Sequence, residues 1–180
     1  MGAAISGKKV AGFAINGKVV AGLAKNGVVI WRKPSDGYPE LIVNGGFEDG
    51  LTGWTVINTG QIISDATSDG VITAAYEGSR WFKSTTNNGG VQQTVTVEPG
   101  ATYHIQFAYG SAVAGRQNYV YLRNASNNVL LFQKWTTSTI KGWHFIEFDY
   151  TIPANVTSLT IQICETVWGR FDAVSMRRNK

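Results

Sequence analysis

Residues 44–54 read NGGFEDGLTGW, a stretch with four glycines, two adjacent acids, a phenylalanine and a tryptophan. Glycine supplies the positive φ angles that tight turns need, and no run of helix formers in this stretch is long enough for a helical turn. The stretch therefore predicts a glycine turn that sets the carboxylate of Glu48 directly after Phe47, an aromatic residue expected in the core. Trp54 is expected to fill the core behind this turn.

Beyond residue 40, apolar and polar residues alternate in short segments separated by turn sequences such as SDG, NNGG and EPGA. Such alternation is typical of strands with one buried face, and no window keeps a helical period. Many short strands with frequent turns predict an all-β fold, a jelly-roll β-sandwich. The expected strands are 41–44, 53–58, 70–76, 79–85, 90–97, 101–110, 118–124, 128–135, 143–152, 158–164 and 171–176.

The N-terminal part of the chain carries a ten-residue repeat. Its units are GKKVAGFAIN (7–16), GKVVAGLAKN (17–26) and the shortened GVVIW (27–31). Asn-Gly closes each full unit and is the strongest short signal for a two-residue hairpin turn. We therefore expect a small three-stranded β-meander over residues 7–33.

The register of these turns places Phe13 opposite Val20 and Leu23 opposite Ile30. Both faces of the meander would then be apolar, and so small a sheet cannot bury two faces by itself. We expect residues 1–33 to be an assembly or attachment segment that holds a homo-oligomer, a trimer, together. The turn-rich stretch RKPSDGYPE contains two prolines and marks a boundary, so residues 34–40 are a linker and residues 41–180 a jelly-roll domain.

The composition excludes several classes of protein. The net charge of +4 comes largely from basic residues near the two ends of the chain, which indicates solvated termini and no nucleic-acid site. The single cysteine, Cys164, excludes an internal disulfide. Because no apolar run is long enough for a membrane span and the N-terminus lacks a signal-peptide pattern, we expect no membrane insertion and synthesis in the cytoplasm.

Four segments in order resemble the carbohydrate-binding modules of the galactose-binding-like jelly-roll superfamily. They are NGGFEDGLTGW, VQQTVTVEPGATYHIQFAYG (91–110), WHFIEFDYTIPANVTSLTIQI (143–163) and GRFDAVSM (169–176). The resemblance covers about residues 40–178 and implies a jelly roll that binds carbohydrate.

In that superfamily a structural calcium ion often bridges the first and last strands. The resemblance implies Glu48 and Asp172 as side-chain ligands of Ca²⁺, with Asn44 and Glu77 as further carbonyl or carboxylate ligands. Calcium binds about six to eight hard oxygen atoms, which such a turn supplies. The family often ends with two adjacent acids, and here Ala173 replaces the second. The alternative is that Glu48 and Asp172 accept hydrogen bonds from the backbone of the turns.

Alternation also predicts which side chains point outward from the strands. An aromatic ring stacks on the C–H face of a sugar, while amides and charged groups bind its hydroxyls. We expect the outward side chains to gather on one sheet face as a carbohydrate-binding site, with Tyr121 as the stacking platform. The candidate residues are Gln106, Tyr119, Tyr121, Arg123, Glu147 and Gln162. The alternatives are an ordinary solvated face, or a platform formed by Trp81, Trp135 or Trp168.

The sequence gives no sign of an enzyme. It contains no nucleophile elbow, phosphate-binding loop or histidine-rich metal spacing. Glu147 and Asp149 share a strand face, but nothing in the sequence marks either as a general acid. His104 and His144 are isolated along the chain. We therefore expect a binding protein without a catalytic site.

The hairpin repeat resembles short β segments in structural proteins of tailed bacteriophages. This resemblance favours a virion protein of the tail or baseplate, or an accessory protein, that contacts other virion proteins and binds host cell-surface carbohydrate. One alternative is a head or tail decoration protein that binds no sugar. Another is the carbohydrate-binding module of a bacterial glycan-degrading system.

Overall fold

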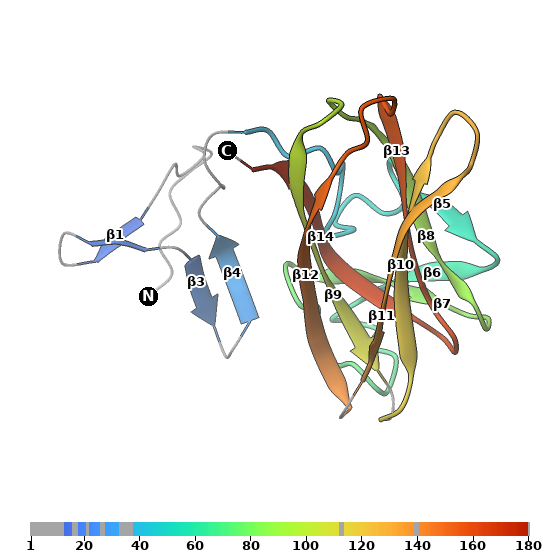
Figure 1. The fold of residues 1–180 in the computed structure, drawn as a ribbon. Helices are drawn as coiled ribbons and strands as arrows, with labels where there is room; N and C mark the ends of the chain where they lie inside the picture. Colours follow the sequence, from blue (N-terminus) through green and yellow to red (C-terminus); the bar gives the residue numbers. More distant parts are fainter. Residues whose placement is uncertain are drawn as a thin grey trace.

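The structure is a computed structural model that describes strand residues 13–15, 18–20, 22–25 and 28–32 and then residues 38–111, 114–138 and 141–179. The larger part is a β-sandwich in which two five-stranded sheets pack face to face (Figure 1). No helix among the described residues is long and apolar enough to cross a membrane. The predicted all-β jelly-roll sandwich is confirmed.

Each sheet is antiparallel throughout. The first sheet has the order β11 (Leu130–Thr137), β10 (Gln117–Asn124), β13 (Ser158–Glu165), β8 (Gly89–Thr96) and β5 (Thr55–Ile57). The second has the order β12 (Gly142–Thr151), β9 (Thr102–Ser111), β14 (Arg170–Arg178), β7 (Arg80–Ser84) and β6 (Gly60–Ser64).

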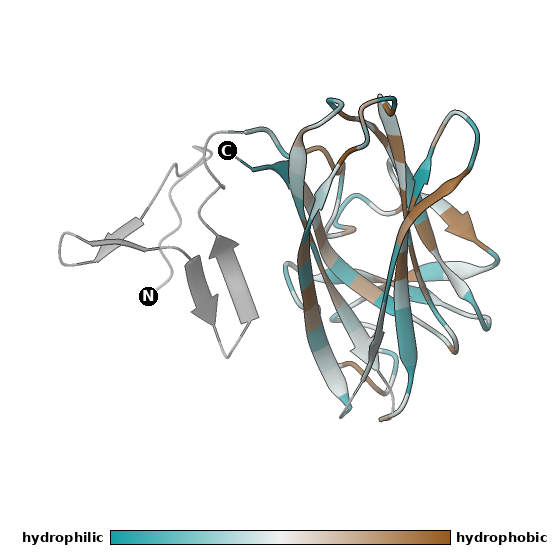
Figure 2. Ribbon diagram, viewed as in Figure 1, coloured by the Kyte–Doolittle hydropathy of each residue, from teal (hydrophilic) through white to brown (hydrophobic). Residues whose placement is uncertain are grey.

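The core lies between the sheets and follows the predicted alternation. Every second residue of the central strands points inward, and hydrophobic residues recur along the strands in Figure 2. Burying these side chains removes apolar surface from water at roughly 25 cal/mol per Å², which is the main stabilising contribution to such a sandwich. The fully buried members include Ile105, Phe107, Val120, Leu122, Ile161, Ile163, Phe171 and Met176.

The stretch 44–54 forms the expected glycine turn against the last strand. Gly45 lies so close to β14 that a Cβ atom on it would be 1.9 Å from the carbonyl oxygen of Val174. Phe47 is fully buried and stacks on Trp54, with 5.2 Å between ring centroids. The indole Nε1–H of Trp54 donates to the carbonyl oxygen of Asn44 at 2.9 Å. The short stretch therefore joins the start of the domain to its end and to its core.

Two of the expected strands are wrong, and one strand was not expected. Residues 41–44 form no strand, although the Leu41 N–H donates to the carbonyl oxygen of Met176 in β14. Residues 70–76 also form no strand, because their apolar side chains cover the outside of a sheet instead of lying within one. β6 was missed because its run of apolar residues is only two residues long.

The segment between β6 and β7, residues 65–79, crosses the outward face of the second sheet, and we call it the covering segment. It buries Ile72 against Trp81 of β7 and packs beside Trp143 of β12. The indole Nε1–H of Trp143 donates to the carbonyl oxygen of Ala74 at 2.9 Å. This part of the second sheet is therefore enclosed on both faces.

The N-terminal repeat forms two separate two-stranded sheets, β1 (Phe13–Ile15) with β2 (Lys18–Val20) and β3 (Gly22–Lys25) with β4 (Val28–Arg32). The predicted pair Phe13–Val20 is confirmed. A single three-stranded meander is not what the structure shows, because the expected middle strand is divided into β2 and β3. Leu23 lies opposite Trp31 and not Ile30, since a bulge shifts the register after Leu23. The side chains of residues 1–33, on which the assembly prediction depends, lie outside the description, as do residues 34–37 of the predicted linker 34–40.

Candidate functional site

The outward face of the first sheet, which we call the open face, is organised in rows of directly paired residues. One row runs across all five strands through Gln133, Tyr121, Gln162, Gln92 and Thr55. Its members share a face because residues directly opposite one another in a ladder point to the same side of the sheet. This row therefore presents three amides, a hydroxyl and a tyrosine.

The neighbouring row carries most of the aromatic surface. Trp135, Tyr119 and Cys164 are directly paired across β11, β10 and β13. The ring of Trp135 lies 4.8 Å from that of Tyr119 and 6.2 Å from that of Tyr121. Tyr119 is 7% exposed and Trp135 is 46% exposed. Trp135 is thus the accessible ring of a three-ring cluster, and Tyr119 supports it from below.

Tyr121 lies between two neighbours along β10. Its ring centroid is 4.8 Å from that of Tyr119. The guanidinium carbon of Arg123 lies over the Tyr121 ring, 5.4 Å from the centroid, in a cation–π contact. Tyr121 is half-buried as a result. Trp135, which the sequence analysis named only as an alternative platform, has the more exposed ring.

The structure separates the six candidate residues into two groups. Tyr119, Tyr121, Arg123 and Gln162 lie together on the open face, and the Arg123 Nε–H donates to Gln162 Oε1 at 3.2 Å. Gln106 and Glu147 are paired with each other on the second sheet, on the other side of the molecule. All six point outward as expected, but the expectation of one shared face is wrong. Alternation fixes the side of a strand, and it does not say to which sheet the strand belongs.

Gln106 and Glu147 lie in a charged part of the second sheet. His104 Nδ1 lies 2.7 Å from Asp149 Oδ1, and His104 Nε2 lies 3.7 Å from Glu147 Oε2. The hydrogen bond from His104 is the main reason that the pKa of Asp149 is lowered. Because this group is largely solvated, it is an ordinary surface charge network.

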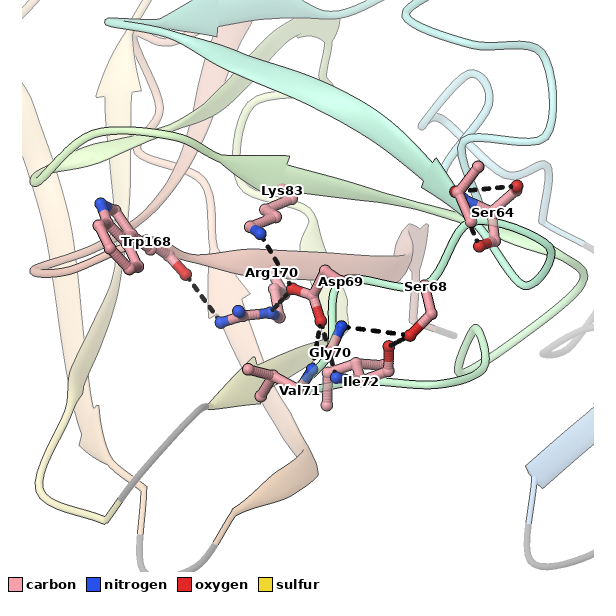
Figure 3. Close-up of polar contacts among 10 residues, drawn as sticks. Ser64, Ser68, Asp69, Gly70, Val71, Ile72, Lys83, Trp168 and Arg170 are labelled. Atoms are coloured by element: carbon pink, nitrogen blue, oxygen red, sulfur yellow. Dashed lines mark hydrogen bonds and ion pairs between the residues drawn. The ribbon is translucent and has the colours of Figure 1, made fainter.

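A buried ion pair holds the covering segment on the second sheet (Figure 3). Asp69 accepts a hydrogen bond from Arg170 Nε, and Lys83 Nζ lies 3.4 Å from the same carboxylate. Asp69 also accepts the backbone N–H groups of Val71 and Ile72 at 2.9 and 2.8 Å. Burial alone raises the pKa of Asp69, but these hydrogen bonds and the Arg170 charge lower it overall.

The two other candidate platforms differ. Trp81 is fully buried beneath the covering segment, so its ring cannot stack on a ligand. Trp168 is 52% exposed in the loop between β13 and β14, with a φ of 53°. Its carbonyl oxygen accepts a hydrogen bond from Arg170 Nη1 at 3.1 Å (Figure 3). Trp168 is an exposed ring outside the rows of the open face.

The expected calcium ligands lie around the glycine turn. Asp172 is 0% exposed, and its carboxylate accepts the N–H groups of Glu77 and Ala173 at 2.9 and 2.7 Å. Glu48 accepts the N–H of Ser79 at 2.7 Å, so the backbone hydrogen bonds of the alternative interpretation are present. Burial raises the pKa of Asp172 well above its ordinary value, which a nearby cation would counteract.

The fit of a metal ion differs among the four residues. A Cβ atom on Gly46 would lie 3.8 Å from Asp172 Oδ1 and 4.0 Å from Glu48 Cγ, so the two acids flank one glycine. Glu77 lines the same cavity of about 360 Å³ as Glu48. The Asn44 carbonyl already accepts the indole N–H of Trp54 at 2.9 Å. Within the described part of the chain, no group of three or more Asp, Glu, His or Cys side chains is placed so that it could hold a metal ion. The Asn44 carbonyl serves the turn.

Glu165, the last residue of β13, points into one end of the core behind the open face. It lies directly opposite Asn118 of β10. Both side chains are 0% exposed, and their carboxyl and amide atoms have no hydrogen-bond partner among the described residues. Burial raises the pKa of Glu165 to about 8, although the charges of Arg170 and Arg116 act against this. Glu165 is enclosed in the interior and adds no group to the open face.

Solved structures with the same fold have different activities. The module TmCBM61, solved in complex with beta-1,4-galactotriose, aligns with a TM-score of 0.58 and 16% identity over 78% of this chain and 99% of that one. A cyclase from Fischerella sp. TAU aligns with a TM-score of 0.63 and 13% identity over 78% and 97% of the two chains. The enzymatically active domain of tailspike protein 4 of bacteriophage CBA120 aligns with a TM-score of 0.58 and 12% identity, over 78% of this chain and 21% of that one. At these identities the likeness shows the fold alone.

The sequence itself is more informative about kinship. No curated protein matches the chain. The model of a family described as carbohydrate binding domain matches residues 39–168, which include the glycine turn and all five strands of the first sheet. The chain therefore belongs to this family of carbohydrate binding domains.

Proposed function

We propose that this protein binds a polysaccharide through the open face and catalyses no reaction of its own. The observation that carries the proposal is the exposed ring of Trp135, supported by Tyr119 and Tyr121 and adjoining a row of amides. A flat aromatic ring suits the C–H face of a sugar, and the amides of Gln133, Gln162 and Gln92 suit its hydroxyls.

The form of the site indicates a weak interaction with an extended ligand. The rows span five neighbouring strands, which lie about 4.8 Å apart, so a chain of several sugar units fits across them. One stacked ring and a few hydrogen bonds that compete with water should give a Kd on the order of 10–1,000 μM. Several copies on one assembly would raise the overall affinity by avidity.

The test is affinity electrophoresis or calorimetry against a panel of plant, microbial and animal polysaccharides. Trp135→Ala should weaken binding by at least about tenfold, because it removes the ring expected to be a hot spot. Trp168→Ala is the matched control, since it removes a similarly exposed ring outside the open face, and it should leave the affinity unchanged. The reverse result would move the site to the loop after β13. A wild-type protein that binds no polysaccharide would favour a decoration protein.

We also propose a structural calcium ion held by Glu48 and Asp172, with Glu77 beside them. The proposal is supported by the two acids that flank Gly46 and by the buried carboxylate of Asp172. A ligand that binds only the folded state stabilises it, so a chelator should lower the Tm of the wild type and not that of Asp172→Asn. An unchanged Tm, with no metal found by elemental analysis, would leave the backbone hydrogen bonds as the whole explanation.

For the N-terminal hairpins we propose attachment, as a trimer, to other proteins of a tailed-phage virion. The Asn-Gly repeat supports this proposal, while a module of a bacterial glycan-degrading system accounts for the open face equally well. Light scattering of the full chain should give three copies, and antibodies against it should label phage particles. A monomer that appears with secreted glycan-degrading enzymes would instead identify the bacterial module.

A further inference from the structure

We infer that the open face selects a polysaccharide with an anionic sugar, and that Arg123 recognises the acidic group. The inference rests on the proposed function and adds the chemical class of the ligand. It comes from three features of the face, namely the fixed position of Arg123, the absence of acids around it, and its place beside the aromatic cluster.

The first feature is a fixed guanidinium with unused donors. Arg123 donates from Nε to Gln162 Oε1 and from Nη1 to the carbonyl oxygen of Asn128, both at 3.2 Å. Its guanidinium also stacks near Tyr121. Of the five N–H groups of an arginine, two are used, so one on Nη1 and both on Nη2 have no protein acceptor among the described residues. Because the side chain is already held, binding a ligand costs less conformational entropy.

The second feature is the charge of the face. The outward positions of the five strands hold no aspartate or glutamate within the described part of the chain, and Arg123 is the charged residue among them. These positions are Thr55, Ile57, Gly90, Gln92, Thr94, Thr96, Gln117, Tyr119, Tyr121, Arg123, Leu130, Gln133, Trp135, Thr137, Ser158, Thr160, Gln162 and Cys164. Burial raises the pKa of Cys164 to about 11, so its thiol adds no negative charge at neutral pH.

A neutral sugar does not need such a face. Amides and hydroxyls suffice for hydroxyl groups, whereas a guanidinium edge matches the two oxygens of a carboxylate in a bidentate pair. The net charge of +4 also favours the approach of a polyanion. Arg123 lies two residues from Tyr121 and four from Tyr119, which pairs with Trp135. A sugar on the aromatic cluster and an acidic group on Arg123 therefore fit adjoining parts of one ligand.

The shared chemistry is an anionic group on the sugar, either the carboxylate of a uronic acid or a sulfate ester. The probes are polygalacturonate, alginate and hyaluronan, each beside its carboxyl-reduced neutral form, together with a sulfated galactan and its desulfated form. Reduction or desulfation removes the charge and keeps the linkages. We expect the wild type to bind at least one charged polymer at least about tenfold more tightly than its neutral form, with affinity that falls as salt rises.

Arg123→Gln should remove that preference, bringing the affinity for the charged polymer down to that for its neutral form. Arg123→Lys should keep part of it, because the charge stays and the bidentate geometry is lost. Arg177→Gln is the matched control, since it removes one positive charge from the other sheet, and it should keep the full preference.

Equal binding of a charged polymer and its neutral form, unchanged in Arg123→Gln, would overturn the inference and leave the proposed function standing. Binding to no polymer, charged or neutral, would overturn both. Loss of the preference in Arg177→Gln to the same extent would show that net charge and not Arg123 is responsible.

Discussion

The outward faces of the two sheets differ in how far the chain covers them. The second sheet is covered in part by the chain itself, with Ile72 packed on Trp81 and Trp143, and Asp69 held by Arg170. The open face of the first sheet carries a comparable aromatic cluster of Trp135, Tyr119 and Tyr121, and no segment of the described chain covers it. The ring of Trp135 is 46% exposed although the protein encloses similar rings elsewhere, and an exposed aromatic ring of this kind is typical of a binding site.

The comparison also explains why the same residue types have different roles on the two faces. Arg170 is almost fully buried, and its charge is neutralised by Asp69. Arg123 is half-buried and is held by an amide and a carbonyl, which leave its charge uncompensated. Arg170, paired with Asp69, holds the covering segment in place. Arg123 is held in position without a carboxylate partner, so its positive charge can pair with an anionic group of a ligand.

The largest expected effect concerns the covered face. Asp69→Ala leaves Arg170 buried without its carboxylate, and breaking a buried pair in this way costs roughly 3–5 kcal/mol. We expect that loss in the free energy of unfolding, measured with urea, together with increased hydrogen exchange over residues 65–79.

The control for this prediction lies on the solvated part of the same sheet. Asp149→Ala removes the partner of His104, and an exposed pair of this kind contributes at most about 1 kcal/mol. If both variants lose the same small amount of stability, the ion pair of Asp69 and Arg170 does not hold the covering segment on the second sheet.

The next effect in size comes from Glu165, which lies between the faces. Its pKa is about 8 in the folded protein against an ordinary 4.5, so the folded state binds the proton more tightly than the unfolded state. The contribution of Glu165 to the free energy of unfolding should therefore be fully present below about pH 4.5. It should fall by a few kcal/mol as the pH rises towards 8. Glu165→Gln should flatten the pH dependence. A wild type whose stability is level between pH 5 and 8 would contradict the prediction.

The sequence predicted the faces of strands better than their places in the fold. Alternation correctly oriented Tyr119, Tyr121, Arg123 and Gln162, because a strand in a two-layer sandwich must bury one side. It placed Gln106 on the same face because sheet membership depends on pairing between distant strands. That pairing is set by the packing of the whole domain and leaves no local trace in the sequence.

The covering segment shows a second limit. GVITAAY has the composition of a strand, yet its apolar residues pack onto the outside of a finished sheet. Periodicity cannot separate these two environments, since both bury isoleucine and alanine. Trp135 was named only as an alternative for a related reason. Its neighbours Tyr119 and Tyr121 become its support only when β10 and β11 pair.

The most direct test of the central claim compares the two faces in one experiment. The chain has six tryptophans, and their indole N–H groups give separate signals in a ¹H–¹⁵N spectrum. Trp135 reports on the open face, while Trp143, whose indole N–H is bonded to Ala74, reports on the covered one. During titration with fragments of the polysaccharide that binds most tightly, the Trp135 signal should move in a saturable way and the Trp143 signal should stay. Movement of Trp143 or Trp168 with a stationary Trp135 would contradict the account.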